Sequence, residues 1–564
     1  MSLSFAPPRL SDVENPNLLG NPSGTITLPN YQPPNVKAAS RKIGSIHQIR
    51  DQQFYIEILM YNQLAGEDPL NVPFFFVDSL VINESIQSCF TTAEITFNTD
   101  FELLSRGSPN DLTVGDKTIP KIKAPYIDRT DGRNRISIQI VPINNEDLDT
   151  YDENLWSMSY DFVVTDIQDL NVPNTQRKKR KYILVDERYQ ILSEKNIEWS
   201  TREYVSITQN IPANTLTDDQ SATFPNVILT YLLYLAGYNQ KTQEFTKVGF
   251  DANGTINAAN VPFFNLDANN WDTATDINDN KLLYHSPANA TALDDLYHVL
   301  SHCMGKDKGP VILDLGRSLS DKSWKLYNLT TLFENSSNNQ IERLFIEDSS
   351  SPDNTTPPIA RATTDTSTSK NFTSSVASRI QRYKFVPMVS TDDSRILNSP
   401  LHYYDFQNNQ WNIWAEENTA KKVEEQLSNY AKAGLYSHKS GLNPHVLLNL
   451  NKTKIEGIMT KNEYSPTKYI SPVAPRNQMV LDALFLGQAI AFQAMGLTIR
   501  APGKFIFIDR IASGDTNPFD DRFLGQWFTT KVSHLFTQSS YITEVVATKM
   551  DTFSKIWNVE DPNY

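Results

Sequence analysis

The C-terminal part of the chain, from Leu497 to Met550, has the pattern of a series of β-strands. Lys504 to Asp509 reads as a strand that ends in Asp, and a loop rich in Gly, Asn, Pro and Asp follows it. Two longer strands come next, Leu524 to Phe536 and Tyr541 to Met550. Strands that follow one another without an intervening helix are expected to pair as an antiparallel sheet.

The same order of features occurs once earlier and more loosely. Arg135 to Val141 reads as a strand, an Asn/Asp-rich loop follows, and Leu155 to Ile167 reads as the next strand. A tryptophan stands at the start of this second strand in both copies, Trp156 in the first and Trp527 in the second. A chain with two related β-modules can form a six-membered ring from three copies.

Length and charge limit the classes of protein that fit. At 564 residues the chain exceeds the roughly 250 to 300 residues at which a single core stops growing, so we expect two to four domains. The net charge of -14 disfavours a protein that binds nucleic acid by neutralising phosphates. An acidic wall would repel DNA, which suits a conduit for it.

Cysteine content and apolar runs bear on the compartment. Cys89 and Cys303 provide neither a disulfide framework nor a metal-ligand cluster, and we expect both to be buried apolar residues. The N-terminus lacks a basic segment followed by an apolar one, so no secretory signal is visible. The longest apolar stretch, Val227 to Tyr238, is shorter than the roughly 20 residues of a membrane-spanning helix. We expect synthesis in a cytoplasm and no membrane span.

Changes of pattern divide the chain into six segments. The predicted segments are an extended Pro-rich arm (1–50), a first β domain (51–205), an inserted helical and strand domain (206–348), a Ser/Thr/Pro-rich linker or loop (349–375), a mixed segment that contributes strand to the second β domain (376–476), and the second β domain (477–564).

Further strands and helices are predicted from local patterns. Outside the two modules, strands are expected at Phe54–Met60, Phe74–Ile82, Thr92–Phe97, Tyr182–Val185, Val311–Leu313, Trp324–Leu329 and Ser378–Met388. Helical spacing is present in 226–235, 419–433 and 477–494. A further helix is predicted after Thr291, which forms a T-x-x-D capping box with Asp294, and Gly305 is expected to end it.

Four groups of residues are candidates for chemistry or binding. His298 and His302, four residues apart on the predicted capped helix, can hold zinc, but without the Glu of H-E-x-x-H we favour a packing pair. The basic run Arg177 to Lys181 can meet an acidic partner or form a solvated turn, and we favour the turn. The acidic segment Asp251 to Asp279 lacks the order of a calcium loop. The aromatic residues of Tyr403 to Trp414 suit either a sugar or a protein contact.

No pattern indicates catalysis. Asp520 and Asp521 form a carboxylate pair of the kind used in glycoside hydrolysis, but we favour a turn that they solvate. The sequence has no G-x-S-x-G, no P-loop and no G-x-G-x-x-G. We therefore expect a protein that is not an enzyme and uses no metal or cofactor.

The chain resembles the baseplate hub proteins of T-even-type contractile phage tails, a family related to the hub portions of secretion-system spike proteins. GKFIFIDR and FLGQWFTTKVSHLFTQSSYITEVVATKM resemble the second tube domain of that family. FVDSLVINESIQSCFTTAEITF and YDFVVTDIQDL with KYILVDERYQIL resemble its first tube domain, and YHSPANATALDDLYHVLSHC resembles the helical insertion that follows. The likeness spans roughly residues 70 to 550 and rests on no single diagnostic motif.

The resemblance implies a mainly β fold with α insertions (α+β), in which two tube-type antiparallel β-barrel domains are related by the internal repeat and carry mixed inserted domains. It implies a homotrimer whose pseudo-sixfold ring adapts a sixfold tail tube above to a threefold spike below. Baseplate wedge proteins would surround this ring, and DNA would pass through without specific binding. The protein would belong to the tail baseplate of a virion, assembled in the host cytoplasm.

The strands of the two modules are expected to line the ring and its interfaces. The residues selected on them are Arg135, Ile138, Trp156, Tyr160, Phe162, Phe505, Phe507, Trp527, Val532, His534, Phe536 and Tyr541. The sequence does not fix which strand face points inward, because a shift of one residue exchanges the faces. The alternatives are a carbohydrate-binding tail or surface protein, a tail-embedded hydrolase, and the hub of a contractile injection system other than a phage.

Overall fold

The structure is a computed structural model of the chain. It describes residues 45–49, 52–62, 70–98, 112–114, 117–119, 134–143, 157–173, 178–194, 196–197, 199–236, 238–239, 244–245, 249–250, 256–257, 283–287, 289–301, 303, 311–315, 317, 324–328, 332, 340–346, 379–386, 401–405, 410–414, 445–446, 489–510 and 524–549.

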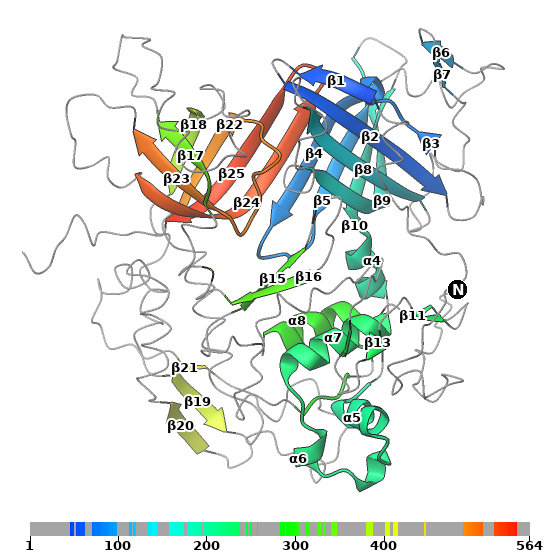
Figure 1. Cartoon of the computed structure of the whole chain (residues 1–564), viewed down its shortest axis with the longest axis vertical. Coiled ribbons are helices and arrows are strands. Elements are labelled where there is room, and N and C mark those ends of the chain that lie inside the picture. Colours follow the sequence, from blue (N-terminus) through cyan, green and yellow to red (C-terminus); the bar gives the residue numbers. More distant parts are fainter. Residues whose placement is uncertain are drawn as a thin grey trace, which may run out of the picture.

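A 14-stranded sheet dominates this part of the chain (Figure 1). Its N-terminal strands, here called the first set, are β1 (Ser45–Ile49), β2 (Gln52–Asn62), β3 (Leu70–Asn71), β4 (Val77–Ser85), β5 (Thr92–Phe97), β8 (Asn134–Ile143), β9 (Met158–Asn171) and β10 (Lys178–Asp186). The second set is β17 (Gln340–Ile346), β18 (Arg379–Val386), β22 (Ala489–Met495), β23 (Phe505–Arg510), β24 (Gly525–Thr537) and β25 (Tyr541–Lys549). Pairing of β4 with β24 joins the two sets.

The two sets have the same strand order. In space the first set runs β2-β8-β9-β10-β5-β4, and the second runs β17-β23-β24-β25-β22-β18. When β1 and β3 are left out and the six remaining strands of each set are numbered along the chain, both orders read 1-4-5-6-3-2. One strand differs, because β2 is antiparallel to β8 whereas β17 is parallel to β23. In the second set the pairing path also returns to its start, since β17 pairs with β18.

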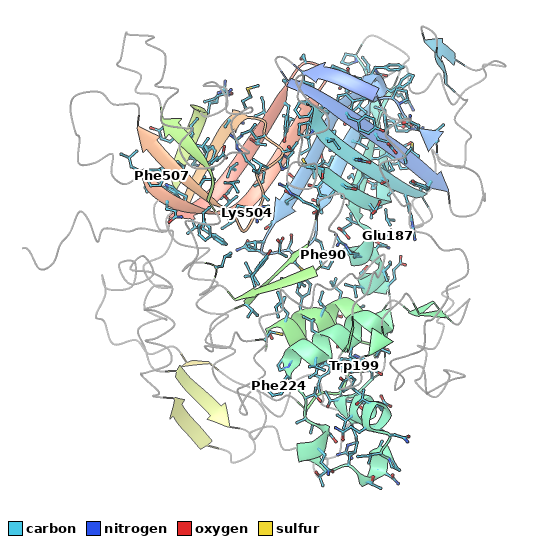
Figure 2. The ribbon with its side chains drawn as sticks, viewed as in Figure 1. Phe90, Glu187, Trp199, Phe224, Lys504 and Phe507 are labelled. Atoms are coloured by element: carbon cyan, nitrogen blue, oxygen red, sulfur yellow. The ribbon has the colours of Figure 1, made fainter. Side chains whose placement is uncertain are left out.

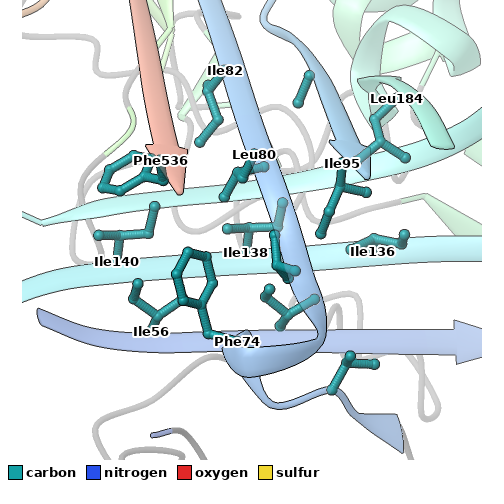
Figure 3. Packing of buried hydrophobic residues seen from close by; sticks show 14 of the residues in the cluster. Ile56, Phe74, Leu80, Ile82, Ile95, Ile136, Ile138, Ile140, Leu184 and Phe536 are labelled. Carbon is teal, nitrogen blue, oxygen red and sulfur yellow. The ribbon is translucent and has the colours of Figure 1, made fainter. Parts of the chain in front are cut away.

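The first set encloses a core to which each of its long strands contributes alternate residues. Ile136, Ile138 and Ile140 of β8 point into this core, and so do Leu80 and Ile82 of β4 (Figure 3). The alternation follows from the two-residue period of a strand, which sends every second side chain to one face. Phe536 and Tyr541 of the second set complete the same core.

The second set has a core of its own. Its buried residues include Ile490 and Phe492 on β22, Trp527 and Val532 on β24, and Val545 on β25. Strand β24 therefore contributes to both cores, with Trp527 and Val532 in one and Phe536 in the other. The two strand sets are thus joined by packing as well as by backbone hydrogen bonds.

The helices lie on one side of the sheet, with a two-stranded sheet between (Figure 1). They are α4 (Glu187–Glu194), α5 (Thr201–Gln209), α6 (Asp218–Ser221), α7 (Pro225–Ala236) and α8 (Ala292–Leu300), and the intervening strands are β15 (Val311–Leu315) and β16 (Trp324–Asn328). Trp199, labelled in Figure 2, packs there against Tyr231 and Tyr284. No helix of the described residues is long and apolar enough to span a membrane.

The remaining elements are short. They are the 3-10 turns η3 (Phe74–Phe76) and η5 (Ala213–Thr215), the strand pairs β6 (Leu112–Val114) with β7 (Lys117–Ile119), β11 (Tyr238–Asn239) with β12 (Glu244–Phe245) and β13 (Gly249–Phe250) with β14 (Ile256–Asn257), and the three-stranded sheet of β19 (Leu401–Asp405), β20 (Gln410–Trp414) and β21 (His445–Val446).

Most local predictions that fall on described residues are confirmed. The capping box of Thr291 and Asp294 is present at the start of α8. The helix predicted over 226–235 is α7, and the strands expected at Phe54–Met60, Thr92–Phe97 and Ser378–Met388 are β2, β5 and β18. Cys89 and Cys303 are free and buried. The predicted helix over 419–433 and the linker 349–375 lie outside the described residues.

Two local predictions are wrong. Phe74 to Phe76 form a 3-10 turn, and the strand begins at Val77. Residues 489–494, given helical spacing above, form β22, in which Ile490, Phe492 and Ala494 face the core with a period of two. Small alanines on both faces of this strand, Ala491 on one and Ala494 on the other, concealed that period. At the end of the predicted arm, residues 45–49 form β1, which pairs antiparallel with β2.

Candidate functional site at the junction of the two strand sets

Strands β4 and β24 meet side by side and hold the two sets together. They pair antiparallel from Lys531 opposite Ser85 to Thr537 opposite Ser79. The Ser533 hydroxyl donates to Asn83 Oδ1 at 2.7 Å across the junction. The Gln538 amide donates to the carbonyl oxygens of Phe74 and Val77, each at 2.6 Å.

A buried polar network lies beneath this junction, centred on Glu84 of β4. The Glu84 side chain is only 8% exposed. Its carboxylate accepts hydrogen bonds from Arg317 Nη1 at 2.7 Å and from the Tyr160 hydroxyl at 2.6 Å. His534 Nε2 lies 3.4 Å from the same carboxylate. Side chains from β4, β9, β24 and the segment after β15 therefore converge on one charge.

Arg317 also binds the backbone of the second set. Its Nη2 donates to the carbonyl oxygens of Thr498 at 2.7 Å and Arg500 at 2.8 Å. Its own carbonyl accepts the backbone N–H of Ser159, on β9, at 2.8 Å. One arginine thus connects both strand sets and the inserted segment.

Aromatic stacking closes the network on the side of β25. The Tyr541 hydroxyl lies 2.7 Å from His534 Nδ1, and the Tyr541 ring stacks on Phe536 with centroids 3.9 Å apart. A Cβ atom at Gly496 would meet the Tyr541 ring at 2.2 Å. Glycine at that position is required by the close approach of the ring, and Gly496 N–H donates to the Tyr541 carbonyl at 2.9 Å.

The network holds one negative and one positive charge. Burial raises the pKa of Glu84, but the charge of Arg317 and hydrogen bonds with His534 and Tyr160 outweigh burial, so the pKa lies below its ordinary value. Burial lowers the pKa of His534, which keeps the imidazole neutral. Burial and the charge of Glu84 raise the pKa of Tyr160, which stays protonated as a donor.

These shifts predict that acid weakens the fold. The unfolded chain binds more protons than the folded one at both groups, so stability is fully present above the ordinary His534 pKa of 6.5 and falls below it. A further loss is expected below the ordinary Glu84 value of 4.5. In urea unfolding, we expect His534→Gln to make the free energy of unfolding depend less on pH between these two values. We expect Glu84→Gln to reduce the same dependence at lower pH. Lys531→Gln, at an exposed position of β24, should keep the wild-type slope, and an unchanged slope in His534→Gln would contradict the assignment.

Two further ion pairs are buried in the sheet. Arg500, 1% exposed, donates to both carboxylate oxygens of Glu342 on β17, at 2.6 and 2.9 Å, and also to the Thr543 hydroxyl. Arg135 pairs with Glu187 at the start of α4, where burial raises the pKa of Glu187 to about 7 against the opposing charge of Arg135. These pairs attach β17 to the second set and α4 to the first.

The chemistry of the junction suits mechanical connection. Among the described residues no group of three or more His, Cys, Asp or Glu side chains is placed to hold a metal ion. The charge of Glu84 is compensated by that of Arg317, and burial raises the pKa of the Tyr541 hydroxyl and holds it protonated. A buried, paired network of this kind fixes the relative position of the parts that supply it.

The structure places the residues that were selected from the sequence mostly inside the chain. Ile138, Tyr160, Phe162, Phe536 and Tyr541 lie in the first core. Trp527 and Val532 lie in the second core. Phe505 and His534 are buried, Phe507 is half-buried, and Arg135 forms its ion pair with Glu187. Trp156 lies outside the described residues. The structure brings three of them, Tyr160, His534 and Tyr541, into the junction network.

The charged members of the network were not selected. Glu84 does carry a signal, since it continues the buried alternation of Leu80 and Ile82 along β4, where a charge is unusual. Arg317 carries none, because it follows a short strand in a polar segment and its partners lie 181 to 233 residues away in sequence.

The basic run was assigned to the wrong element. Lys178 to Lys181 belong to β10, and β9 extends to Asn171, so the turn predicted between Ile167 and Tyr182 is much shorter. Acidic residues of β4, β9 and β5 pair with the run: Lys179 with Asp78 on β4, Arg180 with Asp169 on β9 and Lys181 with Glu94 on β5. Cross-strand charge pairs of this kind stabilise a solvated sheet face.

For the other residues that the sequence suggested for chemistry or binding, the described part of the structure shows no binding or catalytic site. His298 is half-buried and its ring stacks on Tyr284, whereas His302 lies outside the described residues. The segment 251–279, apart from the short strand at 256–257, and the pair Asp520 and Asp521 also lie outside. The aromatic run falls on β19 and β20, whose side chains are not described.

Comparison with known proteins gives structural neighbours only. No protein-family model matches the chain, and no curated protein matches it. A tail protein from Neisseria meningitidis MC58 has a TM-score of 0.37 and 8% identity, with 88% of this chain and 96% of that chain covered. The 43 kDa tail protein of prophage MuSo2 from Shewanella oneidensis has a TM-score of 0.37 and 7% identity, with 88% and 98% covered.

A third neighbour comes from a secretion system. The Francisella PdpA-VgrG complex contains a chain with a TM-score of 0.38 and 11% identity, of which 60% is covered, together with 90% of the present chain. The structural neighbours are thus phage tail proteins and secretion-system spike complexes. The scores are low, and the functional argument rests on the strand order and the junction.

Proposed function

We propose that the chain is a structural hub of a contractile phage tail, in which three copies form a pseudo-sixfold ring between a sixfold tail tube and a threefold spike. The observation that carries the proposal is the shared strand order of the two sets, 1-4-5-6-3-2, within one continuous sheet. Three chains with two equivalent modules each supply six modules, which matches both symmetries.

The continuous part of the sheet has the size for a channel. Eight strands run without a break from β9 through β10, β5, β4, β24, β25 and β22 to β18. Twenty-four strands spaced ~4.8 Å and tilted ~40° would enclose a ring ~50 Å across between backbones, and ~30 Å between side chains. A DNA duplex passes through such an opening. Two copies would leave only roughly 15 Å, which is too narrow.

One face of these strands is available to line the ring, and we call it the outward face. It consists of the positions that alternate with the two cores, such as Val81, Ser533 and Glu544. Residues selected from the sequence lie mainly on the opposite face. The positions that line the ring are therefore the immediate neighbours of the selected residues along each strand. The outward face carries both signs of charge, as in the pair of Lys181 with Glu94, so it is not the acidic wall expected from net charge.

The junction network gives this hub its rigidity. A ring that transmits load from a tube to a spike requires the two modules of each chain to keep a fixed relation. The bonds of Arg317 to Glu84, Thr498 and Arg500 supply that relation within one chain. We also propose that the hub has no catalytic or metal site. Its proposed neighbours are the tube, spike and wedge proteins.

The mass of the purified chain in solution tests the proposal. We expect light scattering to give three times the 64.0 kDa of one chain, and negative-stain images of the same fractions to show a ring with an open centre. A chain that remains monomeric up to high micromolar concentration, with no ring in the images, would count against the hub. Binding to glycans would then become the next hypothesis to examine.

A further inference from the structure

One face of strands β2, β8 and β9 is polar although it is largely buried, and we call its central residues the polar row. The row consists of Glu57 on β2, Ser137 and Gln139 on β8, and Ser159 and Asp161 on β9. These positions alternate with the residues that fill the first core, so their side chains lie on the other face of the strands. Gln139 is opposite Glu57 on one side and opposite Ser159 on the other.

The polar row contains buried hydrogen-bonding groups without partners. Gln139 is 1% exposed, and neither its amide nitrogen nor its amide oxygen has a hydrogen-bond partner among the described residues. The hydroxyls of Ser137 and Ser159, on side chains 3% and 2% exposed, also have none there. Buried polar groups without hydrogen bonds are costly and rare in native proteins. The row therefore requires an occupant that both donates and accepts hydrogen bonds.

The carboxylates of the row favour an occupant with positive charge. Burial, the charge of Asp161 and the charge of Glu57 together raise the pKa of Tyr61 above its ordinary value. Burial raises the pKa of Glu187 to about 7, and the charge of Asp161 adds to that increase. The field that acts on both neighbouring groups is negative, and a negative field attracts cationic side chains.

The chain that leads into β1 reaches the sheet beside this row. Ser45, the first residue of β1, is opposite Ile56, the neighbour of Glu57. The preceding chain cannot continue along the same edge of β2, because β3 pairs with the next stretch of that edge. The core side is filled, since Phe74 contacts the His47 ring of β1 with ring centroids 5.0 Å apart. The remaining path crosses the face that carries the row.

We propose that residues 41–44 turn away from β1 at Gly44 and cross the polar row of the same chain, with Lys42 over β8 and Arg41 over β9. Glycine permits a sharp change of direction. Strands lie ~4.8 Å apart and an extended chain advances ~3.3 Å per residue, so β8 and β9 are ~10 and ~14 Å from β1, and three or four residues span ~10 or ~13 Å. Lys42 and Arg41 stand three and four residues before Ser45. The inference concerns a single copy and stands apart from the ring.

A basic peptide segment supplies the groups that the row requires. The Lys42 ammonium and the Arg41 guanidinium donate hydrogen bonds and carry positive charge, which suits the carboxylates of Glu57 and Asp161. The backbone carbonyl oxygens of the segment accept a hydrogen bond from the Gln139 amide nitrogen. A bare metal ion would leave that nitrogen without an acceptor, so the chemistry of the row favours a polypeptide.

Trypsin digestion of the full-length chain tests the crossing without a variant. Lys37 precedes the proposed crossing and serves as the internal control. We expect cleavage after Arg41 and Lys42 to be at least about tenfold slower than cleavage after Lys37, because a docked segment must open before it is cut. Equal cleavage rates at the three sites would overturn the proposal.

A charge variant tests the contact with the row. Glu57→Gln keeps the shape of the side chain and should raise the rate of cleavage after Arg41 and Lys42 at least about tenfold, with cleavage after Lys37 unchanged. The matched control is Glu94→Gln, which removes an exposed carboxylate on β5 and should change none of these rates. Slow cleavage that persists in Glu57→Gln would overturn the contact.

A disulfide identifies the chain whose segment occupies the row. Arg41→Cys with Ser159→Cys should form a cross-link in the purified chain, whereas Lys37→Cys with Ser159→Cys should form none. Cys89 and Cys303 compete little, because both are buried and burial raises the pKa of both thiols. In a mixture of isotope-labelled and unlabelled chains, cross-linked peptides of one isotope support the crossing. Cross-links between isotopes, or no cross-link, would overturn it.

Discussion

Arg317→Met is expected to lower the free energy of unfolding by about 3–5 kcal/mol, the cost of leaving a buried partner charge uncompensated. The side chain of Arg317 is 15% exposed and that of Glu84 8%, so water can replace little of the lost interaction. Two carbonyl oxygens, of Thr498 and Arg500, lose their donor at the same time. Urea unfolding of the purified chain measures the change.

The matched control is Lys179→Met, which removes an exposed ion pair with Asp78 and should cost at most about 1 kcal/mol. A second variant isolates the charge: Arg317→Met combined with Glu84→Gln should cost less than the sum of the two single changes, because the uncompensated carboxylate is gone. Strict additivity, or a loss of less than about 1 kcal/mol for Arg317→Met, would show that the network does not connect the strand sets.

Trp527→Ala is expected to lower the free energy of unfolding by about 3–5 kcal/mol through the cavity it leaves. Trp527 is 0% exposed and lies in the second core with Ile506 opposite it on β23. Thermal or urea unfolding tests this, with Lys531→Ala on the same strand as a control expected to change stability by less than about 0.5 kcal/mol. A near-neutral Trp527→Ala would instead place the indole on a surface that only assembly covers.

Trp527 and His534 have different roles in the structure, although the sequence analysis assigned them the same one. Both Trp527 and His534 were selected as ring and interface residues, yet Trp527 is a core residue and His534 belongs to the polar network between the cores. Changes at either are therefore expected to act on the stability of the single chain.

Most strands could be predicted from the sequence because the alternation of apolar and polar residues is a local pattern. The hairpin of β8 with β9 and that of β23 with β24 follow from alternation and loop composition alone. Alternation on β22 was concealed by small residues, and the basic run on β10 was mistaken for a turn because charge was considered without its partners on β4, β5 and β9. A local sequence pattern predicts one strand at a time, whereas a charged strand is stabilised by side chains on neighbouring strands, which that pattern does not contain.

By itself the sequence determined a mainly β chain with helical insertions, the positions of most described strands and the capped helix at Thr291. Only the tertiary structure decided that both strand sets share one order, that β4 and β24 join them, and that Glu84, Arg317 and His534 meet beneath the joint. The reason is separation along the chain: periodicity is set by residues a few positions apart. The joint is made by residues hundreds of positions apart, whose approach depends on the packing of the whole sheet.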